Sequence, residues 1–263
     1  MKTPSITGTK EWAVANVNCV SGCPHNCRYC YAKAMARRFK RIASDDDWAR
    51  PVVRPHEVQR RRRRVKGTIM FPTAHDITPE ILEPCLTVLG NLLGAGNRVL
   101  VVSKPHLPCI EELCRRFSPY REQILFRFSI GAISNGILGY WEPHAPRFEE
   151  RLAGLKHAFG NGFATSISME PMLEVDRAAE LVELLAPYVT DAIWFGRMNR
   201  IRSCFRPTCP EDERAIRRIE EGQTDAKTVE VYRALAGHPL LKWKDSVKKV
   251  LGLPLPAQAG LDA

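Results

Sequence analysis

The sequence predicts an α/β fold: a partial (βα)6 barrel of the TIM type, built on an open parallel sheet. Three observations lead to this prediction. Short apolar runs rich in β-branched and aromatic residues recur six times before residue 200. Segments with helical periodicity separate them, and several runs are almost continuously apolar, as strands covered on both faces are. Six units are too few for a closed eight-stranded barrel, so an open partial barrel is expected, with a flat doubly wound sheet as the alternative.

The individual elements follow from these patterns. The expected strands are 12–19, 68–72, 98–103, 124–130, 163–169 and 192–196. The expected helices lie near 30–42, 80–95, 108–117, 146–160 and 177–189. The helix at 146–160 shows an apolar stripe at i, i+4, i+7 and i+11, followed by a Gly-Asn-Gly stop signal. In such a sheet, functional groups gather at the carboxyl ends of the strands.

Two segments interrupt the alternation. Residues 44–66 form a basic insertion that runs from three aspartates to five consecutive arginines. Residues 201–263 form a helical extension that ends in a Pro-containing tail, which we expect to be poorly ordered. We therefore expect the barrel, with its insertion, within residues 1–200 and the extension after it.

The net charge and the lack of long apolar runs indicate which partners the protein could bind and where in the cell it lies. Lys and Arg number 39 against 29 Asp and Glu, a formal net charge of +10. This surplus suits a polyanion such as nucleic acid, although many proteins that bind none share it. No apolar run resembles a signal peptide or reaches the roughly 18 residues of a membrane span. We expect a cytoplasmic protein without a membrane partner, whose thiols stay reduced and whose clustered cysteines bind metal or take part in chemistry rather than form disulfides.

Four cysteines fall within the stretch CVSGCPHNCRYCY. Cys23, Cys27 and Cys30 have the spacing C-x3-C-x2-C and directly follow the first expected strand. Three thiolates on one short loop can hold three irons of a cubane [4Fe–4S] cluster and leave the fourth iron without a protein ligand. The uneven spacing fits a loop that wraps around a cube.

Zinc is the main alternative for this loop. A zinc site normally takes four protein ligands, or three with a water, so Cys19 or His25 could complete it. The chain would then be a non-catalytic zinc-binding and nucleic-acid-binding module. We expect Cys19 instead to be an inward-facing or sheet-end residue of its strand.

The stretch GCPHNCRYCYA, with the aromatic Tyr29 just before the last cysteine, resembles the signature of radical S-adenosylmethionine (SAM) enzymes. The resemblance extends over roughly residues 12–200, since a strand precedes the motif, a helix follows it, and five further strand-like runs come after. Within that superfamily, the chain is most similar to the spore photoproduct lyase-like group, some of whose members are described as DNA repair photolyases.

The resemblance implies a mechanism, two cofactors and a partner. The open iron of a [4Fe–4S] cluster would chelate SAM, and one electron would cleave the sulfonium bond to give methionine and a 5′-deoxyadenosyl radical. That radical would abstract a hydrogen atom from a substrate, with nucleic acid as the first expectation and a peptide or small metabolite as the second. A low-potential electron donor of the flavodoxin or ferredoxin type would be needed. The protein supplies orientation and shielding.

The residues after the second strand depart from the common family pattern. Many members carry a Gly-Gly-Glu motif there, and this chain, like the lyase-like group, lacks it. The resemblance places Thr73 where a hydroxyl accepts a hydrogen bond from the SAM ammonium, and Tyr29 among the cofactor-binding residues. The resemblance also places Asp76 where the lyase-like group has an Asp after the hydroxyl residue, but we expect Asp76 to cap the next helix, since D-I-T-P-E is a typical start signal. His75 has either a cavity-facing or a structural role.

Further candidates end the later strands. Lys104 stands where a positive charge suits the methionine carboxylate of SAM, with an exposed loop lysine as the alternative. Arg127 and Ser129 share one face of their strand by alternation, which indicates a polar lumen. Ser129 resembles the family's hydroxyl near the cofactor ribose or carboxylate. Glu170 is expected to pair with Lys104 or Arg127, because a buried charge needs a partner. The sixth strand offers weaker candidates, Arg197 and Asn199.

The arginine run 60–64 is expected either to contact nucleic-acid phosphates or to form the solvated face of a helix. Spore photoproduct lyase has a hydrogen-donating cysteine immediately before the hydroxyl residue, and this chain has Pro72 there. That difference argues against a reaction on thymine photodimers unless another thiol, such as Cys204, lies close. Cys204 and Cys209 could also supply part of an auxiliary metal site.

Overall fold

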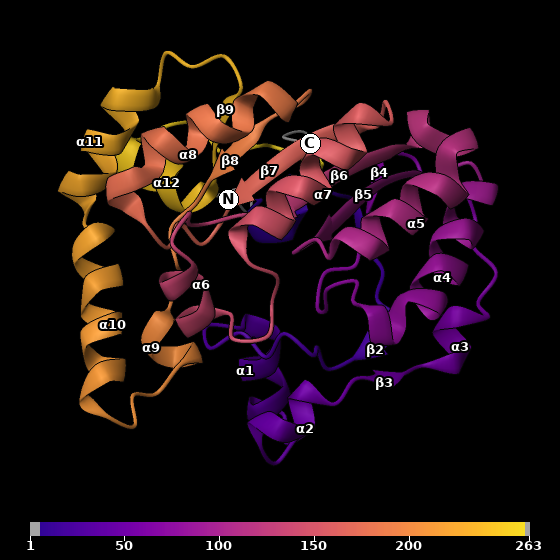
Figure 1. Cartoon of the computed structure of the whole chain (residues 1–263), viewed down its shortest axis with the longest axis horizontal. Helices are drawn as coiled ribbons and strands as arrows, with labels where there is room; N and C mark the ends of the chain where they lie inside the picture. The colour runs from indigo at the N-terminus through magenta and orange to yellow at the C-terminus, as the bar shows by residue number, and fades with distance from the viewer. Residues whose placement is uncertain (1–5, 261–263) are drawn as a thin grey trace.

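The computed structural model describes residues 6–260, so the first five residues and the last three of the expected tail lie outside the described part. Seven parallel strands form one open sheet, in the order β1-β4-β5-β6-β7-β8-β9, with β1 and β9 at its edges (Figure 1). They are β1 (Ala15–Asn16), β4 (Thr68–Phe71), β5 (Arg98–Ser103), β6 (Ile124–Ser129), β7 (Ala164–Met169), β8 (Ile193–Phe195) and β9 (Leu241–Trp243). All six predicted strands are present, and the prediction of an open partial barrel is confirmed.

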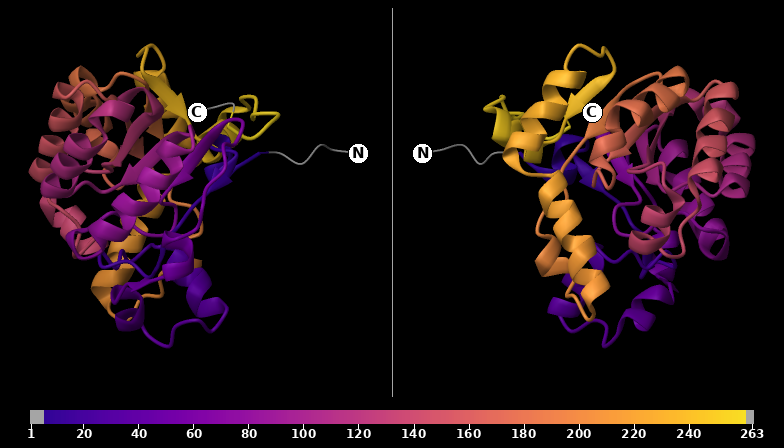
Figure 2. Two further views of the ribbon diagram at one scale, coloured as in Figure 1. Left: turned by 90° about the vertical axis from the view of Figure 1, so that its right-hand side faces the viewer. Right: turned by 60° about the vertical axis from the view of Figure 1, so that its left-hand side comes forward.

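Helices cover the sheet, and Figure 1 places α3, α4 and α5 on one flank and α10 and α11 on the other; Figure 2 shows the same separation from two further sides. The longer helices are α4 (Leu82–Gly94), α5 (Leu107–Phe117), α7 (Phe148–Gly160), α8 (Ala178–Leu185), α10 (Pro210–Gly222) and α11 (Asp225–Leu235). The shorter ones are α1 (Tyr31–Arg38), α2 (Asp45–Ala49), α3 (Pro55–Val58), α6 (Asn135–Trp141), α9 (Ile201–Cys204) and α12 (Asp245–Leu251). The 3-10 helices are η1 (Gly8–Glu11), η2 (Pro79–Ile81), η3 (Ser118–Gln123), η4 (Val175–Arg177) and η5 (Ala186–Tyr188). Within residues 6–260, no helix combines the length and apolarity that a membrane crossing requires.

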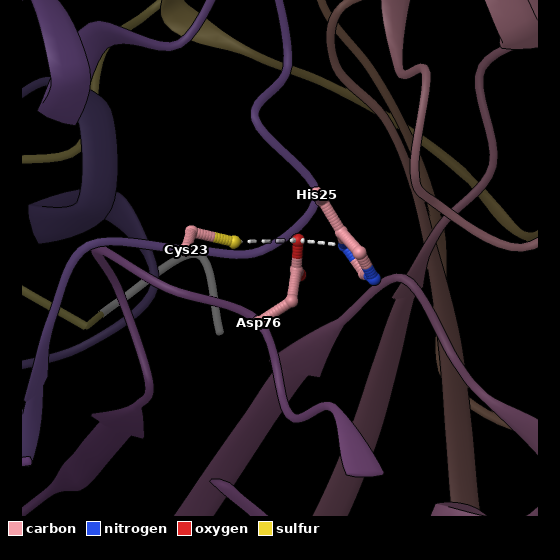
Figure 3. Close-up of side chains that lie close together, drawn as sticks. All are labelled: Cys23, His25 and Asp76. Carbon is pink, nitrogen blue, oxygen red and sulfur yellow. Dashed lines mark hydrogen bonds and ion pairs between the residues drawn. The ribbon is translucent and has the colours of Figure 1, made fainter. Parts of the chain in front are cut away.

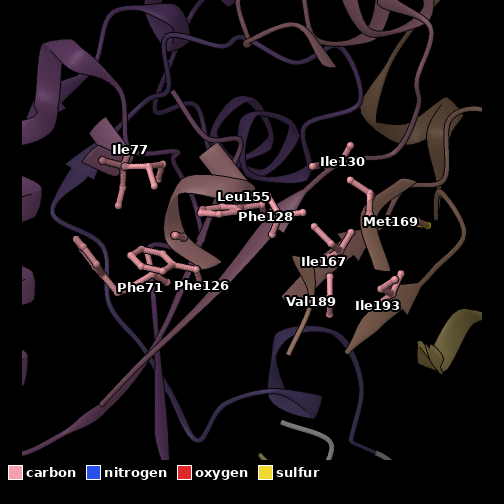
Figure 4. Close-up of a cluster of buried hydrophobic side chains, with 14 of the residues drawn as sticks. Phe71, Ile77, Phe126, Phe128, Ile130, Leu155, Ile167, Met169, Val189 and Ile193 are labelled. Carbon is pink, nitrogen blue, oxygen red and sulfur yellow. The ribbon is translucent and has the colours of Figure 1, made fainter. Parts of the chain in front are cut away.

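The two faces of β6 show how the sequence sorts its side chains. Phe126 and Phe128 are fully buried in the main core, which Figure 4 shows. Burying one such side chain stabilises a fold by roughly 1.5–3 kcal/mol. Arg127 points to the other face, where its guanidinium stacks on the rings of Trp12 and Trp194 at 4.5 and 5.3 Å. The alternation predicted for this strand is therefore confirmed.

The seventh strand, β9, is absent from the sequence prediction. It pairs in parallel with β8 and brings the following residue, Lys244, to the segment that precedes β1. The Lys244 ammonium lies 2.7 Å from Glu11 Oε1 and donates to the Gly8 carbonyl at 2.9 Å. The extension after residue 200 thus supplies part of the sheet, while a domain boundary at that point stays a prediction.

The insertion 44–66 is folded against the barrel. Strand β3 (Val52–Val53) pairs antiparallel with β2 (Val20–Ser21), and α3 ends before the arginines begin. Of the two alternatives for the arginine run, the helix face is wrong, because these residues have no helical turns. Contact with nucleic acid stays a prediction. Neighbouring like charges repel one another at helical spacing. The buried side chain of Asn97 binds the backbone instead, accepting from the Val65 amide at 2.8 Å and donating to the Arg63 carbonyl at 3.1 Å.

Candidate active site

The cysteine loop lies between β2 and α1. Two tight turns shape it, since the amide of Asn26 donates to the Cys23 carbonyl and the amide of Cys30 to the Cys27 carbonyl, each at 3.2 Å. Asn26 takes a left-handed φ of 46° there. Cys30 then caps α1, its sulfur accepting from the Lys33 amide at 3.4 Å. The three sulfurs therefore sit on one compact segment that ends at a helix N-terminus.

The three thiols form a buried donor set. Cys23 and Cys27 are 5% and 6% exposed, and Cys30 is half-buried. Burial raises the pKa of Cys23 to about 12 and that of Cys27 well above its ordinary value, and the charges of neighbouring thiols add to both shifts. Thiolates crowded in this way need a strongly positive partner, which the irons of a cluster supply. The donor set fits a [4Fe–4S] cluster.

Asp76 lies at the centre of a hydrogen-bonded network beside the loop (Figure 3). Its Oδ2 lies 2.8 Å from His25 Nδ1 and 3.9 Å from Cys23 Sγ, and its Oδ1 accepts from the Lys104 amide at 2.9 Å. Burial by itself would raise the pKa of Asp76, but Lys104 and His25 hold it well below its usual range. The prediction that Asp76 caps a helix is wrong, because η2 begins without any side-chain cap. The carboxylate instead ties the cysteine loop to the end of β5.

Cys23, His25 and Asp76 also offer three ligand atoms within 4.8 Å of one another. A neighbouring cation argues against zinc at this place. The Lys104 ammonium lies 3.3 Å from the same oxygen of Asp76 and would repel a dication. The trio is better described as a hydrogen-bonded support of the loop.

Lys104 follows β5 and is 9% exposed, so it is not a solvent-exposed loop lysine. Burial alone would lower its pKa, but the Asp76 carboxylate and the thiols and phenol around it raise the pKa well above its ordinary value. The groups that raise it include Cys27 and Tyr29, which places the ammonium beside the cysteine loop. Lys104 therefore stays charged at any physiological pH.

Tyr29 is held by an ion pair that sequence reasoning missed. Its hydroxyl donates to Glu142, whose other oxygen lies 2.5 Å from Arg151 Nη2. Arg151 also donates to the carbonyl of Ser129 at 3.2 Å. Both charged residues are almost inaccessible. The sequence contained one indication of this ion pair. Arg151 stands at i+3 from Phe148, on the apolar face of its helix, and a buried charge there requires a partner of opposite charge.

Thr73 follows β4 and is fixed by Asn18. Asn18 Oδ1 accepts from the amides of Thr73 and Ala74, each at 2.8 Å, and its Nδ2 donates to the Thr73 hydroxyl at 2.7 Å. The hydroxyl thus has a set position at the carboxyl end of the strand. His75 is buried and accepts from the Cys19 amide through Nε2 at 3.4 Å, so its role is structural.

The ion pairs that Arg127 and Glu170 form differ from those predicted across the lumen. Arg127 Nη2 lies 3.2 Å from Asp191 Oδ2, and its Nε donates to the Ser166 hydroxyl at 3.0 Å. Glu170 lies 3.7 Å from Lys244 Nζ instead of pairing with either expected partner. The pairing of Glu170 with Arg127 or Lys104 is therefore wrong, because the partner comes from the unpredicted segment after β9.

The remaining candidates lie at the margins of this network. Ser129 ends β6 opposite Ser168 of β7 and is half-buried. Arg197 Nη1 forms an ion pair with Asp225 at 2.7 Å, and Asn199 is exposed. Ser129 stays a candidate for cofactor contact, whereas Arg197 is engaged with the extension.

The cysteines outside the loop fall into two groups. Cys19 and Cys85 lie in the main core with their sulfurs 3.9 Å apart, as expected for an inward-facing Cys19. Cys204 is buried and close enough to Cys30 for their thiols to interact electrostatically, whereas Cys209 is exposed at the start of α10. Within residues 6–260, no close trio of potential metal ligands contains Cys204 or Cys209.

An open parallel sheet, with a buried three-cysteine loop and a charged shell at its carboxyl edge, defines a partial-barrel protein that holds an iron–sulfur cluster. The chain belongs to the radical SAM superfamily, whose model matches residues 17–186. Members of this superfamily use a [4Fe–4S] cluster and SAM, and the matched range includes Cys23, Cys27 and Cys30.

Individual relatives are distant. The chain is 24% identical over 183 residues to the uncharacterized protein ORF301 of Acidianus two-tailed virus, a match that covers 65% of this chain and 59% of the viral protein. A spore photoproduct lyase variant aligns with a TM-score of 0.54 at 16% identity, over 84% of this chain and 76% of that one. SuiB of Streptococcus suis aligns with a TM-score of 0.50 at 12% identity, over 90% and 49%. The chain thus spans less than two thirds of the viral relative and about half of SuiB, and the solved structures show the shared fold.

Proposed function

We propose that this chain cleaves SAM reductively and abstracts a hydrogen atom from a substrate, with nucleic acid as the first substrate class. The observation that carries the proposal is the meeting of three cysteines, two buried and one half-buried, with a charged Lys104, where the neighbouring strands β4 and β5 end. When bound, the cluster supplies the electron that breaks the sulfonium bond of SAM. The chain itself binds and orients the cofactor and excludes water.

The residues that we propose to contact SAM are held in position by neighbouring residues. Lys104 offers its ammonium to the methionine carboxylate, steadied by a carboxylate at 3.3 Å. Thr73 offers its hydroxyl to the SAM ammonium, fixed by the half-buried amide side chain of Asn18. Ser129 stands at the end of β6 for the ribose or the carboxylate. Tyr29 has its hydroxyl committed to Glu142, so its proposed role is to pack its ring beside the cofactor.

The substrate class rests on charge and on two precedents. One structure of spore photoproduct lyase holds a dinucleoside spore photoproduct, and one of SuiB holds the precursor peptide SuiA. The net charge of +10 favours the nucleic acid over a peptide. Because Pro72 stands where the lyase has its cysteine, we propose a reaction other than repair of thymine photodimers.

Anaerobic reconstitution tests the proposal. We expect a brown protein with about four irons per chain, as the cluster's stoichiometry requires. It should release 5′-deoxyadenosine when SAM and dithionite are added. A colourless protein that holds zinc and forms no 5′-deoxyadenosine would overturn the proposal in favour of the zinc-binding module. Adding single-stranded DNA, RNA or a peptide then identifies the substrate class by the rise in 5′-deoxyadenosine.

The proposal includes a partner and a location. A low-potential electron donor of the flavodoxin or ferredoxin type would replace dithionite in the cell. A cytoplasmic location would keep the three thiols reduced for cluster assembly. Both are tested by following 5′-deoxyadenosine formation with a flavodoxin system and by fractionating cells that express the chain.

A further inference from the structure

Residues 50–66, called the strap from here on, carry eight Lys and Arg against one acidic residue, Glu57. Most of the surplus that gives the chain its net charge of +10 therefore lies in one short segment. Glu57 engages Arg60 at 3.4 Å and Arg62 at 3.1 Å. The exposed cations of the strap are Arg50, Arg60, Arg61, Arg63, Arg64 and Lys66.

The strap runs from the cysteine-loop edge of the sheet to the opposite edge. It begins just after Trp48, whose carbonyl accepts from the Cys23 amide at 2.9 Å. The Arg54 amide then donates to the Cys19 carbonyl at 2.8 Å, and a side chain of α4 donates to the Val58 carbonyl at 3.2 Å. In Figure 1 this path leads from α2 through β3 to α3, beside α4. Its last residues enter β4, so the strap ends at the amino edge of the sheet.

At this far end the strap borders a cationic hollow. Arg64, Lys66 and Arg98 line it together with Val65 and two glycines, and no acidic side chain is part of the lining. Asn97, which is fully buried, binds the backbone on both sides of Arg64. The cations are therefore presented from a fixed backbone, which lowers the entropy lost when they bind a ligand.

We propose that the strap is a phosphate-binding track that holds a single-stranded nucleic acid along the flank of the barrel while one of its nucleotides occupies the active site. A row of exposed cations suits a polymer with regularly spaced phosphates. The inference deepens the proposed function and rests on it for the choice of nucleic acid as the polymer.

The geometry sets a minimum length for such a ligand. The hollow lies at the amino end of β5 and Lys104 at its carboxyl end, six strand residues away. At a rise of about 3.3 Å per residue the two points are roughly 20 Å apart. A stacked single strand advances about 3.4 Å per nucleotide along its axis, so a stacked polymer needs about six nucleotides to bridge them. A dinucleotide can occupy the active site but is too short to reach the hollow as well.

The test is a binding titration of the reconstituted protein with labelled single-stranded DNA and RNA of about 20 nucleotides, long enough to bridge both points. The strap variant carries three substitutions in the hollow: Arg64→Gln, Lys66→Gln and Arg98→Gln. The control variant removes the same charge from exposed positions of the other flank: Arg206→Gln, Arg218→Gln and Arg233→Gln.

The strap variant should bind the longer polymer at least about 10-fold more weakly, and its log–log salt slope should fall by about 2, since each lost phosphate contact removes roughly 0.7. The control variant should match the unmodified chain, and dinucleotide binding should not change in either variant. Equal affinities and slopes for all three proteins overturn the proposal, as does competition by polyglutamate at the same charge concentration. SAM cleavage without nucleic acid is measured separately, so a failure of the proposed function is distinguishable from a failure of the strap.

Discussion

The guanidinium of Arg28 lies 3.4 Å from the carboxylate of Asp212, joining the cysteine loop to a helix 184 residues later in the chain. Arg28 also stacks on the ring of Tyr140 at 4.4 Å, and the Tyr140 hydroxyl donates to the same carboxylate at 2.6 Å. The amide and hydroxyl of Thr208 donate to its other oxygen, each at 2.8 Å. The extension after residue 200 is thereby fastened to the cysteine loop.

Asp212→Ala should lower the free energy of unfolding by about 3 kcal/mol, since it leaves a cation and several donors without their acceptor. Thermal and urea denaturation measure the change. Glu211→Ala is the matched control, because Glu211 is the exposed neighbour on the same helix. Equal losses for the two variants would contradict a specific role of Asp212.

The same carboxylate should make this contact sensitive to acid. Burial by itself would raise the pKa of Asp212, but Tyr140, Thr208 and Arg28 hold it below its usual range. A carboxyl group with a lowered pKa stabilises the fold above its unfolded pKa, about 3.9, and loses that contribution as the pH falls through the folded pKa. The stabilities of the unmodified chain and of Asp212→Asn should therefore differ at pH 6, and the difference should shrink progressively as the pH falls from about 4 towards the folded pKa. Urea unfolding at a series of pH values measures this, and a constant difference would contradict it.

Removing one thiol of the loop should abolish the cluster. Cys27→Ala leaves two protein ligands, and we expect the iron content to fall from about four per chain to well below one. Cys114→Ala removes a buried thiol of α5 and should leave iron and visible absorbance unchanged. A full cluster in Cys27→Ala would contradict the assignment of the loop.

Lys104→Met should weaken SAM binding about 10-fold or more, because a charge-assisted hydrogen bond contributes roughly 1.5–3 kcal/mol. Calorimetry on the reconstituted protein measures the affinity, and iron content checks that the loop is intact. Lys156→Met is the control, because Lys156 is exposed on α7. An unchanged affinity in Lys104→Met would remove the carboxylate-binding role.

A glycine after β6 fixes a close approach of two backbone segments. A Cβ added at Gly131 would lie 2.3 Å from the Pro171 carbonyl oxygen, whereas one at Gly139 would meet nothing within 4 Å. Gly131→Ala should destabilise the fold by about 1–3 kcal/mol through overpacking. Gly139→Ala should be neutral or stabilise helix α6 by up to about 1 kcal/mol. Thermal denaturation of the pair decides whether the contact is as tight as described.

The features that could be predicted from the sequence are those defined by residues close together in the chain. The six predicted strands lie within apolar runs of the sequence, and the three cysteines are neighbours in one loop, so both could be recognised locally. Strand β9 has three residues and no pattern of its own, and only its pairing with β8 makes it a strand. The supports of the loop are distant in sequence: His25 and Asp76 are 51 residues apart, and Tyr29 and Glu142 are 113 apart.

Two errors share one cause. Asp76 stands in a segment that locally resembles a helix cap, and the arginine run locally resembles one face of a helix. In each case a tertiary partner determined the outcome, Lys104 for the carboxylate and Asn97 for the backbone next to Arg64. Local propensity is a weak guide wherever a buried polar group can satisfy a distant one.

The position of β9 has a consequence for how the chain is made. A ribosome releases β8 well before it releases residues 241–243, so the Ile-Trp-Phe edge of β8 has no neighbour during that interval. An unpaired apolar edge is a template for pairing with another chain. Truncation before Leu241 leaves this edge permanently unpaired and should therefore yield aggregates rather than a soluble, inactive enzyme.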